Sequence, residues 1–370
     1  MKKWQFFALA VLWLGLAAFA WLKPPQAASD TERRELEQFP AITGKTLLDG
    51  SFMADFESYT LDQFPLRDGF RTLKAMFHYG ILRQKDNNGI YLEKGYAAQL
   101  EYPLNETSVD HALSVFRRIY EKNLADSRVF YTIVPDKNYY LAGEEYPAMD
   151  YARLFEKMET GMDFATYVNL TDCLTIEDYY RPDTHWRQEK LLPAAARLCQ
   201  AMGIPAPDAA DYAATAAKEP FYGVYYGQAA LPMEGDTMYL LHSDVLDGCT
   251  TYVGDWDVKT NTPVYQQLYK GVYDRQRLEG EDMYEAYLSG IQSILRIENP
   301  SAKTDRELIV FRASFGSSIV PLLMQDYAVV TVIDIREIDA MTLRAFGINW
   351  DADVLFLFST LVLNNSETIK

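Results

Sequence analysis

An acid and a base stand two positions apart in residues 179–186, which read Tyr-Tyr-Arg-Pro-Asp-Thr-His-Trp. Pro182 disfavours a helical conformation at the residue before it, and the polar residues 187–190 open a segment with helical apolar periodicity. We therefore expect Asp183 and His185 to lie on a loop that enters a helix. There a carboxylate can hold an imidazole in one tautomer and leave its second nitrogen free as a base. Taken alone, the triplet also fits a turn with a hydrogen-bonded histidine that does no chemistry.

A possible partner for this base is a serine near the end of the chain. The apolar segment at 307–311 predicts a buried strand, and it runs into Arg-Ala-Ser-Phe-Gly-Ser-Ser at 312–318. This order of strand, small-residue turn and helix exposes Ser314 at the carboxyl edge of a sheet. A hydroxyl needs a neighbouring base to become a nucleophile, and His185 supplies it if its loop lies at the same edge. Without a base, the three serines only cap a helix.

The same turn contains groups that could bind an oxyanion. The backbone N–H groups of Phe315 and Gly316 lie just before the predicted helix and can face an oxyanion, and Arg312 is the nearest cationic side chain in sequence. Inside a helix, Pro321 would clash with the carbonyl four residues back. We therefore expect the helix to begin near residue 317 or 318, with Ser317 as its N-cap.

The elements that would position these residues alternate in type from about residue 109 onward. Helices are expected at 111–123, 151–159 and 190–202, and strands at 128–134, 164–170, 307–311, 328–335 and 353–358. Continuous apolar strands separated by helices predict a mainly parallel sheet covered on both faces, which is a three-layer α/β/α fold. In such sheets, reactive residues gather on loops at the carboxyl ends of strands.

The N-terminus carries a targeting segment. Met-Lys-Lys precedes an uncharged apolar run at 6–22, and Lys-Pro-Pro follows it, as in a signal sequence or signal anchor. We expect an uncleaved anchor that crosses the cell membrane once and leaves the rest of the chain outside the cytoplasm. If the segment is cleaved instead, the protein is secreted.

Three segments follow from these patterns. They are a signal anchor at 1–25, a helical and hairpin extension at 26–105, and an α/β domain at 106–370 with an irregular insertion around 205–300. The hairpin is expected to turn at Asp-Asn-Asn-Gly, residues 86–89. The aromatic and glycine-rich run at 221–228 either lines a sugar-binding cleft or forms a buried strand or hairpin.

Composition narrows the function further. The 370 residues carry a formal net charge of −17, which argues against nucleic-acid binding because that requires a basic surface. The three cysteines, Cys173, Cys199 and Cys249, form no CxxC pair and do not have the spacing of metal ligands. The sequence does not decide whether two of them form a disulfide and leave one free thiol. A metal site at Asp183 and His185 has no third ligand visible in the sequence, and no metal or cofactor is expected.

Together these residues resemble the DHHW family of bacterial envelope proteins, which is related to alginate O-acetylation proteins and, more remotely, to SGNH hydrolases in a permuted arrangement. The resemblance covers nearly all of the chain beyond the anchor. It rests on Tyr-Tyr-x-x-Asp-Thr-His-Trp at 179–186, Asp-Met-Tyr-x-x-Tyr-Leu-Ser-Gly at 282–290, Ile-Glu-Asn-Pro at 297–300, Ser314, Pro-Leu-Leu at 321–323, Val-Ile-Asp-Ile-Arg at 332–336 and Asp-Val-Leu at 353–355. It implies an SGNH hydrolase-like fold with Ser314 as nucleophile, His185 as base and Asp183 as the orienting carboxylate.

Two departures from the pattern of these families bear on activity. Ala313 stands where Asp is common before the nucleophile, and Ser359-Thr360 stand where SGNH enzymes have an Asn that donates to the oxyanion. A third departure, Thr184 in place of His, falls at the variable second position of the Asp-x-His-Trp motif. Ser359 and Thr360 therefore join the oxyanion candidates, and Tyr180 and Trp186 are candidates to contact substrate.

The resemblance implies an extracytoplasmic O-acyltransferase or acetylesterase that acts on a cell-envelope polysaccharide. Acetyl transfer would further imply a membrane partner that exports the acyl group. The two departures favour a second hypothesis, a non-catalytic glycan-binding or scaffold protein on the same fold. The oligomeric state is left open.

Overall fold

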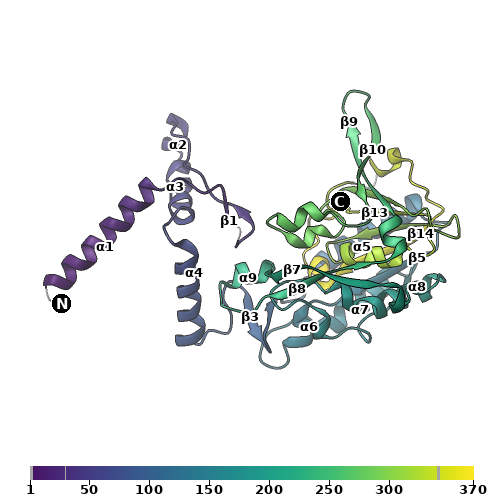
Figure 1. Cartoon of the computed structure of the whole chain (residues 1–370), viewed down its shortest axis with the longest axis horizontal. Coiled ribbons are helices and arrows are strands. Elements are labelled where there is room, and N and C mark those ends of the chain that lie inside the picture. The colour runs from purple at the N-terminus through teal and green to yellow at the C-terminus, as the bar shows by residue number, and fades with distance from the viewer. Residues whose placement is uncertain (1–2, 30, 340–341) are drawn as a thin grey trace. The chain divides into compact units, whose positions relative to one another are not determined.

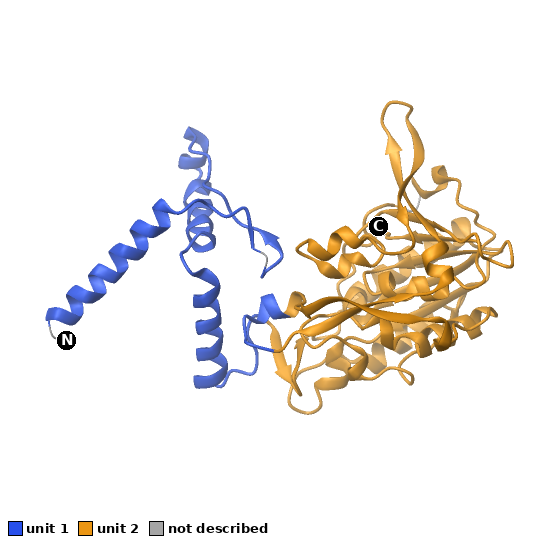
Figure 2. Cartoon of the chain, in the orientation of Figure 1, with its two compact units in different colours: residues 1–88, 226–233 blue, residues 89–225, 234–370 orange. Residues whose placement is uncertain are grey.

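The computed structural model describes residues 3–29, 31–339 and 342–370. The chain divides into two compact units (Figure 2). Unit 1 comprises residues 1–88 and 226–233, and unit 2 comprises residues 89–225 and 234–370. The segment boundaries expected from the sequence at residues 25 and 105 stay predictions.

Unit 1 is mainly helical. Its helix α1 (Lys3–Leu22) has 20 residues and is long and apolar enough to cross a membrane. Unit 1 also contains β1 (Ala28–Ser29), β2 (Arg34–Glu35), α2 (Gly44–Leu48), α3 (Ser51–Asp62) and α4 (Arg67–Met76). The apolar run in the sequence therefore forms a continuous helix, as a membrane anchor or a signal sequence would.

The prediction of a hairpin that turns at residues 86–89 is wrong, because only the segment after that turn forms a strand. The segment before that turn is helical, because α4 continues as a π-helical turn at Phe77–Ile81. The hairpin instead joins β3 (Ile90–Glu93) to β4 (Tyr96–Gln99). Lys94 and Gly95 form its turn with φ of 52° and 83°, the left-handed geometry whose twist matches a two-residue hairpin.

Unit 2 contains an eight-stranded sheet with the order β10-β9-β11-β13-β12-β14-β5-β6. Its strands are β5 (Val129–Val134), β6 (Thr166–Tyr167), β9 (Thr250–Asp257), β10 (Thr262–Lys270), β11 (Ile294–Glu298), β12 (Glu307–Arg312), β13 (Val329–Ile333) and β14 (Asp353–Ser359). The five strands from β13 to β6 run parallel, and β11, β9 and β10 are antiparallel to their neighbours. The predicted mainly parallel sheet is confirmed.

Helices cover both faces of this sheet because the strands are apolar on both sides. Val354, Phe356 and Phe358 of β14 enter a core with α5 (Glu106–Asn123) and α7 (Tyr151–Gly161). The alternate residues Leu355 and Leu357 enter a second core with α8 (Leu192–Met202). The three-layer α/β/α prediction is confirmed, and it sets the carboxyl ends of β12 and β14 side by side.

Residues 205–300 are more regular than expected. They contain a separate hairpin of β7 (Ala213–Phe221) and β8 (Asp236–His242), and the β9–β10 pair, which projects from unit 2 in Figure 1. The aromatic run at 221–228 starts at the buried end of β7 and continues into α9 (Val224–Ala229). The strand expected at 164–170 shrinks to β6, and all three cysteines are free thiols.

Short helices complete unit 2. They are α6 (Lys137–Leu141), α10 (Asp244–Gly248), α11 (Gly316–Ile319) and α12 (Thr360–Asn364). Of these, α6, α11 and α12 each begin within a few residues of the carboxyl end of a strand in the parallel part of the sheet. The loops before them form the edge at which the candidate site lies.

Candidate active site

Ser314 lies on the turn between β12 and α11, at the carboxyl end of a central parallel strand. Asp183 and His185 lie on a loop between short 3-10 turns at Ile176–Asp178 and Gln188–Lys190. Although 129 positions separate Ser314 from His185 in sequence, the two side chains are hydrogen bonded. The structure thus brings the three residues singled out in the sequence to one edge of the sheet.

The three side chains form a continuous hydrogen-bonded series. The Nε2 atom of His185 lies 2.8 Å from the Ser314 hydroxyl oxygen, and Nδ1 lies 2.6 Å from Oδ1 of Asp183. A carboxylate accepts only, so Nδ1 carries the proton and Nε2 is left as the acceptor for the serine hydroxyl. The series therefore has the donor order that a serine nucleophile and its base require.

Asp183 is fully buried and has further partners. Its Oδ1 accepts the backbone N–H of His185 at 2.9 Å, and its Oδ2 accepts the N–H of Val224 at 2.8 Å. Gly223 lies against the same carboxylate, and a Cβ atom there would stand 2.0 Å from Cβ of Asp183. Glycine at 223 is thus a condition for the carboxylate to occupy its place.

The imidazole is held by an aromatic ring as well as by hydrogen bonds. Tyr284 stacks on His185 with ring centroids 3.8 Å apart and planes 7° apart. Its hydroxyl lies 2.8 Å from Ser318 Oγ, and burial raises the pKa of this phenol well above its usual range. No local pattern marks Tyr284 as a functional residue, although it lies in the block at 282–290 that carries the family resemblance.

Trp186 and Tyr180, the two candidates for substrate contact, are instead buried. The indole N–H of Trp186 donates to the carbonyl of Phe315 at 3.0 Å and to Ser318 Oγ at 2.9 Å. Tyr180 is fully buried beside Tyr287, with hydroxyl oxygens 3.4 Å apart. Trp186 therefore ties the loop that carries His185 to the turn that carries Ser314.

Replacing Trp186 with phenylalanine is expected to destabilise the chain by about 2–4 kcal/mol, because it removes two buried hydrogen bonds and leaves a gap. The midpoint of urea denaturation measures the change. Trp256→Phe is the matched control, since Trp256 is 37% exposed and its indole N–H donates to the exposed Asn261, and a change within about 0.5 kcal/mol is expected there. Equal midpoints for both variants would contradict the conclusion that Trp186 stabilises the contact between the His185 loop and the Ser314 turn.

The serine turn differs from its sequence prediction. Helix α11 begins at Gly316, with Phe315 at the cap position, so Ser317 lies inside the helix and is not its N-cap. The helix can start early because it ends before Pro321, which falls in the first turn of a 3-10 segment at Val320–Leu323. The N–H of Gly316 donates to the carbonyl of Ala313 at 2.9 Å, which removes it as an oxyanion donor.

Arg312, Ser359 and Thr360 are also not placed to contact an oxyanion. Arg312 is fully buried, packs against Gly316 and donates to the carbonyl of Gly290 at 2.7 Å, and burial lowers its pKa. Ser359 caps α12, and the Thr360 hydroxyl donates to Asp136 at 2.7 Å. Among the described residues, the backbone N–H groups of Ser314 and Phe315 donate no hydrogen bond, so they are the remaining donors on the turn.

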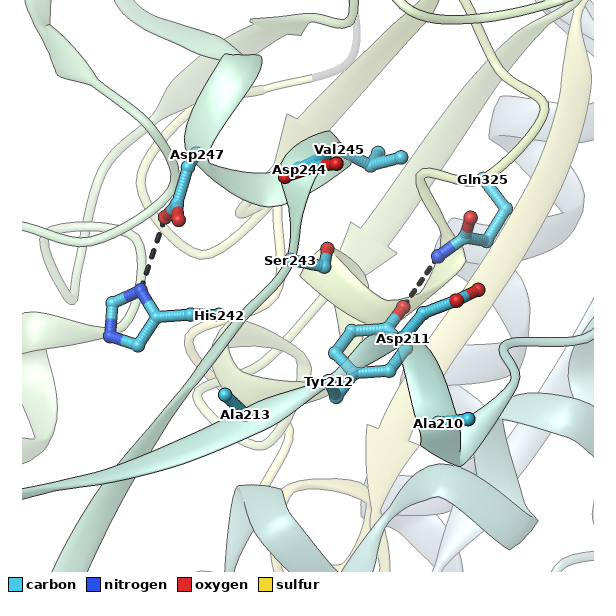
Figure 3. A pocket seen from close by; sticks show the side chains of 10 residues that line it. All are labelled: Ala210, Asp211, Tyr212, Ala213, His242, Ser243, Asp244, Val245, Asp247 and Gln325. Atoms are coloured by element: carbon cyan, nitrogen blue, oxygen red, sulfur yellow. Dashed lines mark hydrogen bonds and ion pairs between the residues drawn. The ribbon is translucent and has the colours of Figure 1, made fainter.

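A second histidine–carboxylate pair lies elsewhere on unit 2. His242 Nδ1 is 3.1 Å from Asp247, at a surface pocket of about 630 Å³ beside β7, β8 and α10 (Figure 3). The other ring nitrogen faces Arg275 at 3.4 Å, and the neighbouring Ser243 caps α10. Arg275, rather than a serine, therefore faces the second nitrogen of His242, and none of Ser314, His185 and Asp183 lines the pocket.

In the part of the chain that the structure describes, no third metal ligand lies beside Asp183 and His185. Within residues 3–29, 31–339 and 342–370, no group of three or more histidine, cysteine, aspartate and glutamate side chains is arranged to hold a metal ion. Both ring nitrogens of His185 are already engaged, one by a carboxylate and one by a hydroxyl. The arrangement fits proton transfer between serine and histidine better than metal binding.

Comparison with known proteins supports the fold. No family model matches the chain, and no curated protein matches it in sequence. A DHHW family protein from Eubacterium siraeum is structurally similar, with a TM-score of 0.62 and 23% identity over 77% of this chain and 95% of that one. PatB1 from Bacillus cereus has a TM-score of 0.57 and 17% identity over 76% of this chain and 98% of that one.

PatB1 also matches in a structure with a sulfonyl adduct, with a TM-score of 0.56 and 17% identity over 74% of this chain and 95% of that one. The O-acetyltransferase domain of Pseudomonas putida AlgJ matches more weakly, with a TM-score of 0.43 and 14% identity over 75% of this chain and 92% of that one. That similarity is too low to carry an argument. The chain shares the fold of the DHHW protein and of PatB1, and the resemblance inferred from sequence agrees with this.

Proposed function

We propose that this protein is a serine-dependent O-acyltransferase or acetylesterase that acts on a cell-envelope polysaccharide outside the cytoplasm. The observation that carries the proposal is the hydrogen-bonded series of Ser314, His185 and Asp183, with distances of 2.8 and 2.6 Å. The hydroxyl is partly exposed, whereas its two partners are buried. A substrate can therefore reach the nucleophile while the base stays shielded from water.

In the first half-reaction, Ser314 Oγ attacks the carbonyl carbon of an acyl ester and its proton passes to Nε2 of His185. Asp183 stabilises the imidazolium, and the oxyanion faces the backbone N–H groups of Ser314 and Phe315. The tetrahedral intermediate then collapses, and the leaving alcohol takes the proton from His185. An acyl group is now bonded to Ser314, and the imidazole is neutral again.

In the second half-reaction, a sugar hydroxyl or water gives its proton to His185 and attacks the acyl carbon. Ser314 leaves and recovers the proton, which restores the starting state. Transfer to a sugar makes the protein an acetyltransferase and would require a membrane partner that delivers acyl groups. Helix α1 would hold unit 2 at the membrane where such a partner lies.

Labelling of Ser314 tests this proposal. A sulfonyl group bonds to a nucleophile, and PatB1, a protein of the same fold, carries a sulfonyl adduct. We expect a sulfonyl fluoride to modify the full chain once, at Ser314, and p-nitrophenyl acetate hydrolysis to fall about 10⁴-fold or more in Ser314→Ala. Ser317→Ala is the control and should keep both properties. Turnover and labelling that persist in Ser314→Ala would exclude this nucleophile.

The second candidate is a non-catalytic glycan-binding protein on the same fold. It is favoured by Ala313 and by the engagement of Ser359 and Thr360 in capping and in the bond to Asp136, which leave no side-chain oxyanion donor at those positions. Binding of wall polysaccharide that is equal in wild type and Ser314→Ala, together with absent sulfonyl labelling, would support this candidate.

A further inference from the structure

Lys137 is a buried amine with no part in the acyl-transfer steps. It is the first residue of α6, directly after β5 and Pro135-Asp136, and only 2% of its surface is exposed. Burying an ammonium without partners costs free energy, and a helix N-terminus disfavours positive charge. A lysine at this position therefore needs partners that offset both costs.

Its partners lie on the loop that carries Asp183. The amine Nζ donates to the carbonyl oxygens of Tyr180 at 2.8 Å and Arg181 at 3.0 Å. Two aromatic rings enclose it, with the centroids of Tyr225 and Tyr96 at 5.2 and 5.7 Å from Nζ. Rings at this range stabilise a cation without neutralising it.

Holding these carbonyls restricts Asp183. Only Pro182 separates Arg181 from Asp183, and the proline ring fixes its own φ. The N–H of Arg181 also donates to Asp236 at 2.6 Å, and the N–H of Tyr180 donates to the carbonyl of His185 at 3.0 Å. Hydrogen bonds to Lys137, to Asp236 and to the carbonyl of His185 thus fix the backbone that precedes Asp183.

The charge of Lys137 acts on the same carboxylate. The negative charges of Asp183 and Asp236 favour the ammonium form of Lys137, and the phenol rings of Tyr96 and Tyr225 lie beside the amine. Burial lowers the pKa of Lys137 to about 7, and the two carboxylates oppose that shift. The amine is therefore a cation at acid pH and loses its charge as pH rises through about 7. A nearby cation favours the ionised form of a buried carboxylate.

We propose that Lys137 is a positioning residue for Asp183. Its amine fixes the backbone that leads to the carboxylate, and its charge keeps that carboxylate ionised against the His185 imidazole at acid pH. The kinetic part of this inference rests on the function proposed above, whereas the structural part does not.

Two variants separate the hydrogen bonds from the charge. Lys137→Met keeps the approximate length and removes both, and Lys137→Gln keeps N–H donors without the charge. Thr132→Val is the matched control, because Thr132 is a buried side chain on β5 whose hydroxyl donates to a backbone carbonyl, that of Val168 at 2.8 Å, away from the triad.

The first measurement is acetyl-ester turnover against pH for the full chain in detergent. For Lys137→Met we expect kcat to fall about 10-fold or more with KM changed less than about twofold. The acid limb of the profile should move to higher pH by about one unit. In Lys137→Gln, kcat should fall less, but the acid limb of the pH profile should move by the same amount. Profiles of both lysine variants that match Thr132→Val would overturn the proposal.

The second measurement does not need turnover. The proton between His185 Nδ1 and Asp183 should give a low-field proton resonance. As the pH is lowered, we expect both lysine variants to lose this resonance at a higher pH than wild type and Thr132→Val do. An unchanged pH range in the lysine variants would overturn the role of Lys137, even with turnover intact. Absent turnover in wild type would instead overturn the proposed function and leave this resonance to decide the inference.

Discussion

The His185→Ala variant is expected to hydrolyse acetyl esters about 10⁴-fold or more slowly than the wild-type chain. The reason is that His185 Nε2 is the acceptor 2.8 Å from the Ser314 hydroxyl, and a hydroxyl without a base is a poor nucleophile. Steady-state hydrolysis of p-nitrophenyl acetate measures the loss. His242→Ala is the matched control, because His242 also pairs with a carboxylate, Asp247, but faces no serine.

The double variant with Ser314→Ala makes the test sharper. If Ser314 and His185 act as one unit, removing both should cost about as much as removing either alone. Independent contributions would multiply instead, and the double variant would then be far slower than each single variant. A multiplied loss, or a His242→Ala variant as slow as His185→Ala, would contradict the assignment of the base.

Gly223→Ala is the second change with a large expected effect. The added Cβ would stand 2.0 Å from Cβ and 2.1 Å from Oδ2 of Asp183, so either the backbone at 223 or the carboxylate must move. We expect turnover to fall about 10²-fold or more, because displacement of about 1 Å in a catalytic group can cost that much. Overpacking should also lower the free energy of unfolding by about 1–3 kcal/mol.

Gly248→Ala is the control for this change. Gly248 lies at the end of α10, and a Cβ there would meet only Ser301 Oγ, at an ordinary 3.8 Å. We expect its turnover to equal that of wild type and its denaturation midpoint to change little. Retained turnover in Gly223→Ala would show that the close approach of residue 223 to Asp183 is not needed.

The fold was readable from the sequence wherever apolar runs were continuous. The strands at 128–134, 307–311 and 353–358 match β5, β12 and β14 to within a residue or two at each end, because strands buried on both faces leave little room for polar residues. The turn at 86–89 does form, with Asn88 and Gly89 at φ of 55° and 75°, but the apolar residues before it continue a helix, so the strands pair across the second left-handed turn at Lys94 and Gly95. Local turn chemistry alone did not separate these two positions.

The candidate triad shows a similar division. Residue types and spacing single out Asp183, His185 and Ser314, since a carboxylate two positions from a histidine and a serine after a buried strand are local patterns. Sequence could not show that Arg312 and Trp186 are buried, or that Thr360 bonds Asp136. Exposure and partner choice depend on which segments pack above a residue, and those segments are distant in the chain.

By itself, then, the sequence determined the layer architecture, the N-terminal apolar helix and the three residues of the candidate triad, because each follows from residue types and their spacing along the chain. Only the tertiary structure decided that the loop before α8 meets the turn before α11, that Tyr284 stacks on the imidazole, and that Gly223 leaves room for Asp183. The physical reason is that these contacts join residues 40 to 129 positions apart, and their geometry is fixed by how the sheet and its helices pack rather than by local preference.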